Sequence, residues 1–166
     1  MTGGPVPPGG GNQRNVPGRR GARLGVDVGT VRVGVAVSDP DGILASPVTT
    51  LSRDIQALTD VAALATLVTE RDVVEVVVGL PRTLRGDQGP AAAAARAYGD
   101  LVAARIAPVP VVFTDERLTT VLAHRGLAER GMNSRARRAV VDQAAAVAIL
   151  QSRLDELRRA GADERR

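Results

Sequence analysis

Residues 24–39 read LGVDVGTVRVGVAVSD and place one carboxylate, Asp27, inside an otherwise apolar run. Valine dominates both halves of this stretch and Gly29 and Thr30 separate them, which predicts a β-hairpin. An aspartate at the end of such a strand has two interpretations. It caps the DVGT turn through local backbone hydrogen bonds, or it points into a cleft that a phosphate can approach closely beside Gly29.

The hydrophobic pattern on either side of this hairpin predicts alternating strands and helices. Strands are expected at 23–28, 31–38, 46–51, 73–80 and 109–114, and helices at 54–70, 90–106, 115–130 and 134–157. Three strands in hairpin order, followed by helix and strand in alternation, predict an α/β fold with a mixed sheet.

The length of 166 residues suits one domain, expected over residues 23–157. Residues 1–22 are rich in Gly, Pro and Arg and predict a disordered tail, and residues 158–166 predict a charged C-terminal tail. No segment has the pattern of a signal peptide or a membrane span, so we expect a soluble, cytoplasmic protein without a membrane partner.

Composition restricts the chemistry available to this chain. It has no Cys and no Lys, and His124 is its only imidazole, so thiolate sites and Schiff-base chemistry are excluded. Carboxylates and hydroxyls remain for catalysis. A bound metal would have oxygen ligands, which favours Mg²⁺ or Mn²⁺.

Charge and aromatic content indicate how an anionic partner would be recognised. Much of the net charge of +4 comes from the two tails, but residues 124–140 hold five Arg against one Glu and could contact phosphates. Tyr98 and Phe113 are the only aromatic residues, so stacking on unpaired bases is almost excluded. Recognition by backbone and shape, as in duplex or branched nucleic acid, is the expectation.

Three further acidic residues lie in unusual places. Asp115 and Glu116 directly follow a predicted strand, where they either complement a helix dipole or face a site, and spacing does not say which acid would do so. Asp142 lies in the apolar run AVVDQAAAVAIL. A buried carboxylate needs a partner, and Arg138, four residues earlier, a bound cation or another polar site would serve.

Carboxylates from the first strand, a later strand end and the C-terminal helix could converge on a divalent metal. Such a cluster would activate water for phosphodiester hydrolysis.

Four stretches occur together in a known order: GVDVGTVRVGVAVSD, VVVGLPRT, TDERLTT and VDQAAAVAILQSRLD. Over about residues 23–157 the chain therefore resembles the YqgF/RuvX family. Its members are bacterial RNase H-like nucleases described as Holliday junction resolvases and as pre-16S rRNA processing enzymes.

This resemblance implies an RNase H-like mixed five-stranded sheet flanked by α-helices. It implies a catalytic, metal-binding triad of Asp27, Glu116 and Asp142 that holds Mg²⁺ or Mn²⁺. The candidate nucleic-acid contacts in and beside the motifs are Thr30, Arg32, Arg82, Arg117, Arg135 and Arg138.

The function implied is cleavage of structured RNA at the 5′ end of pre-16S rRNA during ribosome biogenesis. The alternative is a Holliday junction resolvase acting on branched DNA, for which a homodimer is expected because two strands must be cut symmetrically. A remoter alternative is a nucleic-acid-binding module without catalysis. The hairpin also resembles that of actin-like ATPases, but the chain lacks their second lobe and second phosphate loop.

Overall fold

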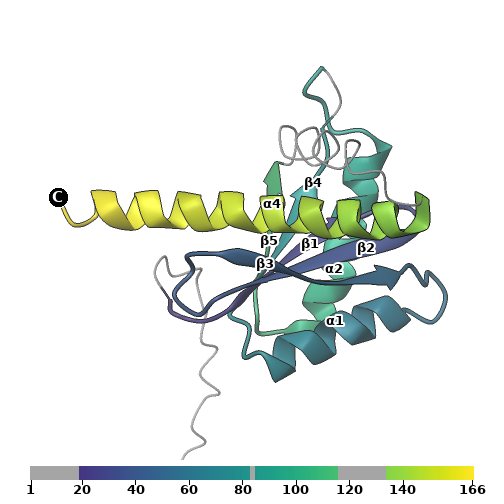
Figure 1. Cartoon of the computed structure of the whole chain (residues 1–166), viewed down its shortest axis with the longest axis horizontal. Coiled ribbons are helices and arrows are strands. Elements are labelled where there is room, and N and C mark those ends of the chain that lie inside the picture. Colours follow the sequence, from purple (N-terminus) through teal and green to yellow (C-terminus); the bar gives the residue numbers. More distant parts are fainter. Residues whose placement is uncertain (1–18, 83–84, 116–133) are drawn as a thin grey trace, which may run out of the picture.

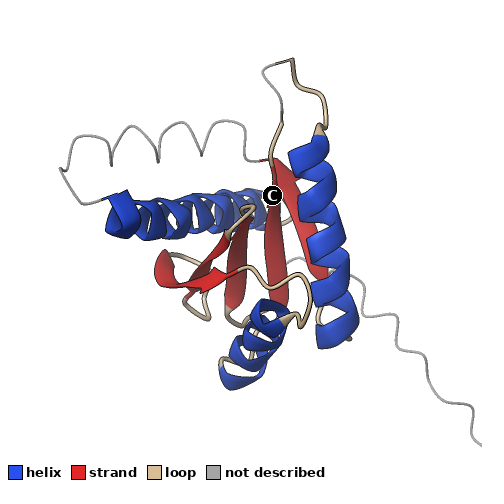
Figure 2. Cartoon of the chain, turned by 90° about the vertical axis from the view of Figure 1, so that its right-hand side faces the viewer, coloured by secondary structure: helices blue, strands red, loops and turns tan. Residues whose placement is uncertain are grey.

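The computed structural model describes residues 19–82, 85–115 and 134–166. Its centre is a five-stranded sheet in the order β3-β2-β1-β4-β5. One helix, α4, covers one face of the sheet, and α1 and α2 cover the other (Figures 1 and 2). The elements are β1 (Arg23–Val28), β2 (Arg32–Ser38), β3 (Ala45–Ser52), α1 (Thr59–Glu70), β4 (Glu75–Leu80), α2 (Pro90–Ile106), β5 (Val111–Asp115) and α4 (Ser134–Asp163).

The sheet is mixed, as the sequence predicts. β2 pairs antiparallel with both β1 and β3, whereas β4 pairs parallel with β1 and with β5. The change from hairpins to parallel pairing occurs where helices begin to connect the strands, because parallel neighbours need a crossover connection. The prediction of a mixed five-stranded sheet flanked by helices is confirmed.

The two faces of the sheet are packed differently. The face under α1 and α2 presents the large residues of β1, β2 and β4, and Tyr98 packs among them. The face under α4 presents smaller groups such as Ala36 and Val77, which pack against Ala146 and Leu150. Small side chains on this face let α4 approach the strands closely.

The first helix begins later than predicted, at Thr59 rather than Asp54. The Asp54 carboxylate accepts hydrogen bonds from the backbone N–H groups of Gln56 and Ala57 and from the Thr59 hydroxyl. These bonds, that from Ala57 above all, lower the pKa of Asp54. Local bonds of this kind form a turn that competes with the helix, so α1 starts only after Leu58.

Both ends of the predicted domain differ from the structure. α4 continues to Asp163, so most of the predicted C-terminal tail is helical, and Arg158 forms an ion pair with Asp155 there. At the other end, the Gly21 N–H donates to the Pro40 carbonyl at 2.9 Å, so residues 19–22 are bonded to the fold. Residues 1–18 of the predicted tail, and residues 116–130 of one predicted helix, lie outside the described residues.

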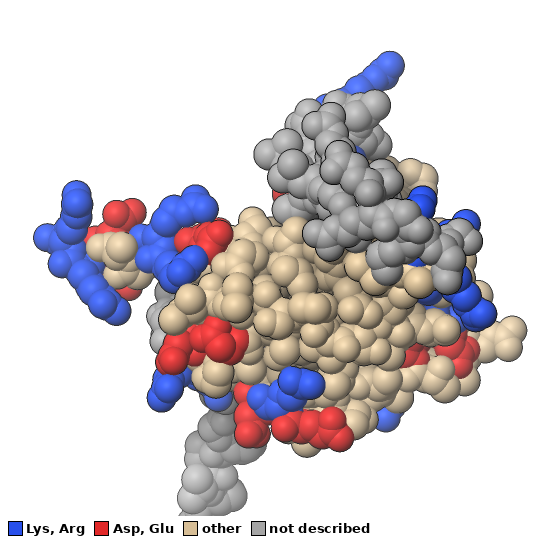
Figure 3. All heavy atoms as spheres, in the orientation of Figure 1, with Lys and Arg blue, Asp and Glu red and all other residues tan. Residues whose placement is uncertain are grey.

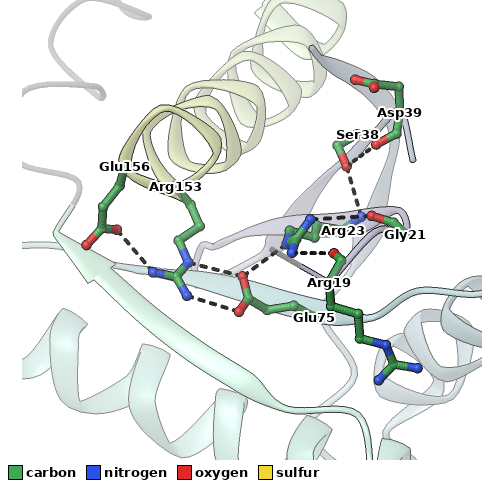
Figure 4. A network of polar contacts seen from close by, with 8 residues as sticks. All are labelled: Arg19, Gly21, Arg23, Ser38, Asp39, Glu75, Arg153 and Glu156. Carbon is green, nitrogen blue, oxygen red and sulfur yellow. Dashed lines mark hydrogen bonds and ion pairs between the residues drawn. The ribbon is translucent and has the colours of Figure 1, made fainter. Parts of the chain in front are cut away.

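A buried ion cluster ties α4 to the sheet where β1 and β4 begin (Figure 4). The Glu75 carboxylate accepts hydrogen bonds from Arg153 Nε at 3.1 Å and from Arg153 Nη2 at 3.0 Å. Arg23 Nε lies 3.5 Å from the same carboxylate. The side chains of Glu75 and Arg23 are only 5% and 7% exposed, so these charges depend on one another rather than on water.

Within the described ranges, no helix has the length and apolar character needed to cross a membrane.

Candidate active site at the carboxyl edge of the sheet

Three parallel strands end together at one edge of the sheet. β1, β4 and β5 end at Val28, Leu80 and Asp115, and the hydrogen-bond registers align these ends. Ligands of open α/β sheets bind outside the carboxyl ends of the strands. This edge is therefore the first place to look for a site.

Asp27 lies at this edge, on the face covered by α4. A Cβ built on Gly25 would lie 2.6 Å from the Ala146 carbonyl oxygen and 2.6 Å from Leu150 Cβ, so Gly25 faces α4 directly. Side chains alternate along a strand, and Asp27, two residues later, faces the same way. The side chain of Asp27 is half-buried between hairpin and helix.

Gly34 brings the helix onto the hairpin at the same level. It lies directly opposite Asp27 in the β1–β2 pair. A Cβ on Gly34 would lie only 2.0 Å from the Asp142 carbonyl oxygen, so the position requires glycine if α4 is to pack here. Opposed residues of an antiparallel pair have Cα atoms about 4.5–5.5 Å apart. The helical turn that carries Asp142 therefore rests on the strand pair that carries Asp27.

The carboxylate of Asp142 has a partner that the sequence analysis did not predict. Its Oδ2 accepts a hydrogen bond from Arg32 Nε at 2.8 Å. The prediction offered Arg138, a cation or another polar site. Arg138 is exposed, and the partner observed, Arg32, comes from the other end of the chain. Arg32 lies two residues before Gly34 in β2, so its side chain is on the sheet face that α4 covers. This pair therefore depends on how α4 packs on the sheet, which the sequence alone does not show.

Polar contacts hold the Asp142 turn in place. Gln143 Nε2 donates to the Thr50 hydroxyl oxygen at 3.1 Å, and that hydroxyl donates to the Ala139 carbonyl at 3.0 Å. Thr50 is the partner of Gly34 in β3. Asp27 in β1, Gly34 in β2 and Thr50 in β3 therefore lie in one row across the sheet, and α4 contacts this row at Gly34 and Thr50.

Asp115 belongs to the opposite face. Phe113 packs in the cluster beneath α1 and α2, whereas Val112 packs in the cluster beneath α4. Alternation places Asp115 on the side of Phe113, away from Asp27. Its carboxylate pairs with Arg82 Nε at 2.8 Å, and Arg82 Nη1 also donates to the Gly86 carbonyl.

Glu116 and Arg117, the other predicted members of this segment, lie outside the described residues. Within the described residues, no group of three or more Asp, Glu or His side chains could hold a metal. The described part of the site supplies two carboxylates, Asp27 and Asp142. Their oxygen donors, with no Cys in the chain, fit a hard cation such as Mg²⁺ or Mn²⁺.

The described nucleic-acid candidates are accessible to differing extents. Thr30, Arg135 and Arg138 are exposed, at the hairpin turn and in the first turns of α4. The side chains of Arg32 and Arg82 are 30% and 35% exposed, and each already pairs with a carboxylate. Thr30, Arg32 and Arg82 all lie at the carboxyl edge, next to the ends of β1 and β4.

One group at this edge escaped the sequence analysis. Arg53 donates from its backbone N–H to the Val31 carbonyl at 2.8 Å and from Nη1 to the Gly29 carbonyl at 3.2 Å, so it holds the DVGT turn. Its guanidinium lies 4.8 Å from the centroid of the Tyr98 ring and 3.6 Å from the buried Asp60 carboxylate.

Burial, reinforced by the charge of Asp60, raises the pKa of the Tyr98 hydroxyl, which therefore stays neutral. No sequence signal marks this group, because Arg53 and Asp60 each read as an ordinary surface charge.

The chain is similar in sequence to one family model and to several named bacterial proteins. A family model described as "RuvX: Holliday junction resolvase" matches residues 21–156. A Frankia casuarinae protein named as a candidate pre-16S rRNA nuclease is 62% identical over 136 residues, which cover 82% of this chain and 67% of that one. A Mycobacteroides abscessus protein of the same name is 56% identical over 144 residues, 87% of each chain.

The solved structure of Thermus thermophilus RuvC aligns with a TM-score of 0.50 and 16% identity, and covers 84% of this chain and 96% of that one. At this identity the likeness concerns the fold alone. It confirms the predicted RNase H-like fold.

Proposed function

This chain belongs to the RuvX family of Holliday junction resolvases, and from that premise we propose that it is a metal-dependent nuclease acting on structured nucleic acid. The observation that carries the proposal is the contact of Asp142 with Gly34, directly opposite Asp27. Two carboxylates from distant parts of the chain are brought to the carboxyl edge of the sheet, where a phosphodiester could reach them.

We propose Asp27, Asp142 and Glu116 as the residues that hold the metal. A divalent ion bound there would polarise the phosphate and lower the pKa of an attacking water. Asp142 is kept in position by Arg32, whose remaining N–H groups can donate to a phosphate oxygen. For Glu116 the support is the family motif TDERLTT and the commitment of Asp115 to Arg82 on the other face.

The proposed nucleic-acid contacts surround this edge. Thr30 and Arg32 lie beside the end of β1, and Arg82 follows β4. Arg135 and Arg138 are exposed on α4 close to the Asp142 turn, and Arg117 is proposed from the sequence alone. Positive groups around a metal site would position the backbone without reading base sequence.

The substrate we propose is the precursor of 16S rRNA, cleaved at its 5′ end in the bacterial cytoplasm. The support is the name carried by relatives that are 53% to 62% identical. A second candidate, resolution of Holliday junctions, is favoured by the description of the family. Junction resolution would require a homodimer, because two opposed strands must be cut, whereas a monomer suffices to trim RNA.

A side-by-side cleavage assay tests this proposal. The full chain is incubated with 5′-extended 16S rRNA precursor and with a four-way DNA junction, each with Mg²⁺ or with EDTA. We expect Mg²⁺-dependent appearance of the mature 5′ end and little junction cleavage. If the protein cuts the junction symmetrically and sediments as a dimer on it, the function is resolution of Holliday junctions instead. Binding of both substrates without any cut would leave a non-catalytic binding module.

A further inference from the structure

A second basic site lies at the far end of α4 from Asp142. The described residues form a groove of about 470 Å³ between the C-terminal turns of α4 and the segments before β1 and after β2. Its lining includes Arg20, Arg23, Asp41, Arg158, Gly161 and Arg165. We call it the arginine groove. Blue side chains, with red ones among them, gather around this projecting end of the helix in Figure 3.

The arginine groove has more positive charge than its own acids neutralise. Asp41, the single acid of the described lining, pairs with Arg20 at 2.7 Å, and both side chains are exposed. Arg158 pairs with Asp155 just outside the groove. Arg165 forms no ion pair with any described residue. An anion entering the groove would therefore meet Arg165 without an ion-pair partner among the described residues. It would have to compete only with the carboxylates of Asp41 and Asp155 for Arg20 and Arg158.

Part of this groove is rigid. Arg23 is held at its base by Glu75, by the Gly21 carbonyl and by the Arg19 carbonyl (Figure 4). Arg23, only 7% exposed, therefore forms the floor of the groove and is not itself a phosphate donor. The exposed arginines above it, Arg20, Arg158 and Arg165, suit phosphate, because a planar guanidinium donates two parallel hydrogen bonds. The segment that precedes Arg19, residues 1–18, contains Arg14 and no acidic residue.

We propose that the arginine groove binds the phosphate backbone of the same nucleic acid whose cleavage is proposed at the Asp27–Asp142 edge. The identity of this ligand rests on the proposed function. The two sites lie along one helix: Asp142 and Gly161 are 19 residues apart, about 28 Å at the rise of an α-helix. That span equals about eight base pairs of B-form DNA at 3.4 Å per pair, and a few more pairs of an A-form RNA duplex, whose rise per pair is smaller.

A duplex that runs along α4 would therefore reach both sites, and one much shorter than eight pairs would reach only one. The groove would add affinity without contacting the bond to be cut. Its contribution would depend on the length of the substrate and on salt, because it comes from contacts to phosphates.

Gly161 offers a way to test the groove without removing any existing contact. It lines the groove, lies in α4, and a Cβ added there meets nothing within 4 Å. Gly161→Glu adds a negative charge to the groove, and Gly161→Gln is the matched neutral control. Binding of the full chain to fluorescent RNA duplexes of about 24 and about 6 base pairs is measured by anisotropy in EDTA, so that no strand is cut.

We expect wild type to bind the long duplex more tightly than the short one. Gly161→Glu should lose about tenfold in affinity for the long duplex, with a salt dependence shallower by about one unit, and less than about twofold for the short one. Gly161→Gln should stay close to wild type with both probes.

Equal affinity of Gly161→Glu and Gly161→Gln for the long duplex would overturn the groove and leave the proposed cleavage site intact. Equal losses on the long and the short duplex would overturn the claim that one duplex occupies both sites. A wild-type chain that binds neither duplex would overturn the proposed function and this inference together.

Discussion

Replacing Asp142 by Asn is expected to lower the rate of Mg²⁺-dependent cleavage by at least about a thousandfold. The change removes one proposed ligand from a metal that stabilises transition-state charge by several kcal/mol, and about 4 kcal/mol corresponds to a thousandfold. Asp27→Asn should have the same effect from the other side of the site. The fold should survive, because the Arg32–Asp142 pair is partly exposed and such pairs contribute about 1 kcal/mol or less.

Two control variants separate the possible reasons for such a loss. Asp100→Asn removes an exposed carboxylate from α2, on the other face of the sheet, and should leave the rate unchanged. Arg32→Gln breaks the ion pair but keeps the Asp142 carboxylate, so it should cost much less than Asp142→Asn. The rates are measured under single-turnover conditions. If Arg32→Gln and Asp142→Asn cleave at equal rates, the role of Asp142 is to pair with Arg32 and not to bind the metal.

Replacing Glu75 by Gln should destabilise the fold by about 3–5 kcal/mol, because it leaves the buried Arg23 without a compensating charge and Arg153 with only the exposed Glu156. Arg23 and Arg153 both contact this carboxylate, and their side chains are only 7% and 13% exposed. The contacts join α4 to the first residues of β1 and β4, so their loss should loosen the whole α4 face (Figure 4). Urea denaturation measures the free energy of unfolding.

The same substitution at Glu156 is the matched control. Glu156 also pairs with Arg153, at 3.2 Å, but its side chain is 64% exposed. Glu156→Gln should therefore cost less than about 1 kcal/mol. If Glu75→Gln and Glu156→Gln unfold at the same urea concentration, the buried cluster does not have the role assigned to it here.

Much of the fold could be predicted because local and global signals agree along most of the chain. Valine-rich runs separated by turn residues predicted β1 and β2, and Pro90 begins α2 as its fixed φ angle suggests. The element ends were less predictable. Asp54 delays α1 through bonds that depend on the turn it forms, and α4 extends to Asp163 with an ion pair in its last turns.

Residues of the proposed site could be singled out where a residue conflicts with its surroundings. A carboxylate inside an apolar run is costly, and this conflict singled out Asp27 and Asp142. Their proximity was not predictable from the residues alone, because it depends on the strand register and on the missing Cβ of Gly34. Arg32 as the partner of Asp142 likewise needs the packing of two segments 110 residues apart.

The central claim is that Asp27 and Asp142 belong to one metal site, and mapping that site on the polypeptide tests it without any substrate. Fe²⁺ replaces Mg²⁺ on the full chain, ascorbate and peroxide generate hydroxyl radicals at the bound ion, and mass spectrometry locates the backbone cuts. We predict cuts near Asp27 and near Asp142 in the same sample, both suppressed by excess Mg²⁺ and both lost in Asp27→Asn. Cuts near only one of these residues, or cuts that persist in Asp27→Asn, would contradict a shared site.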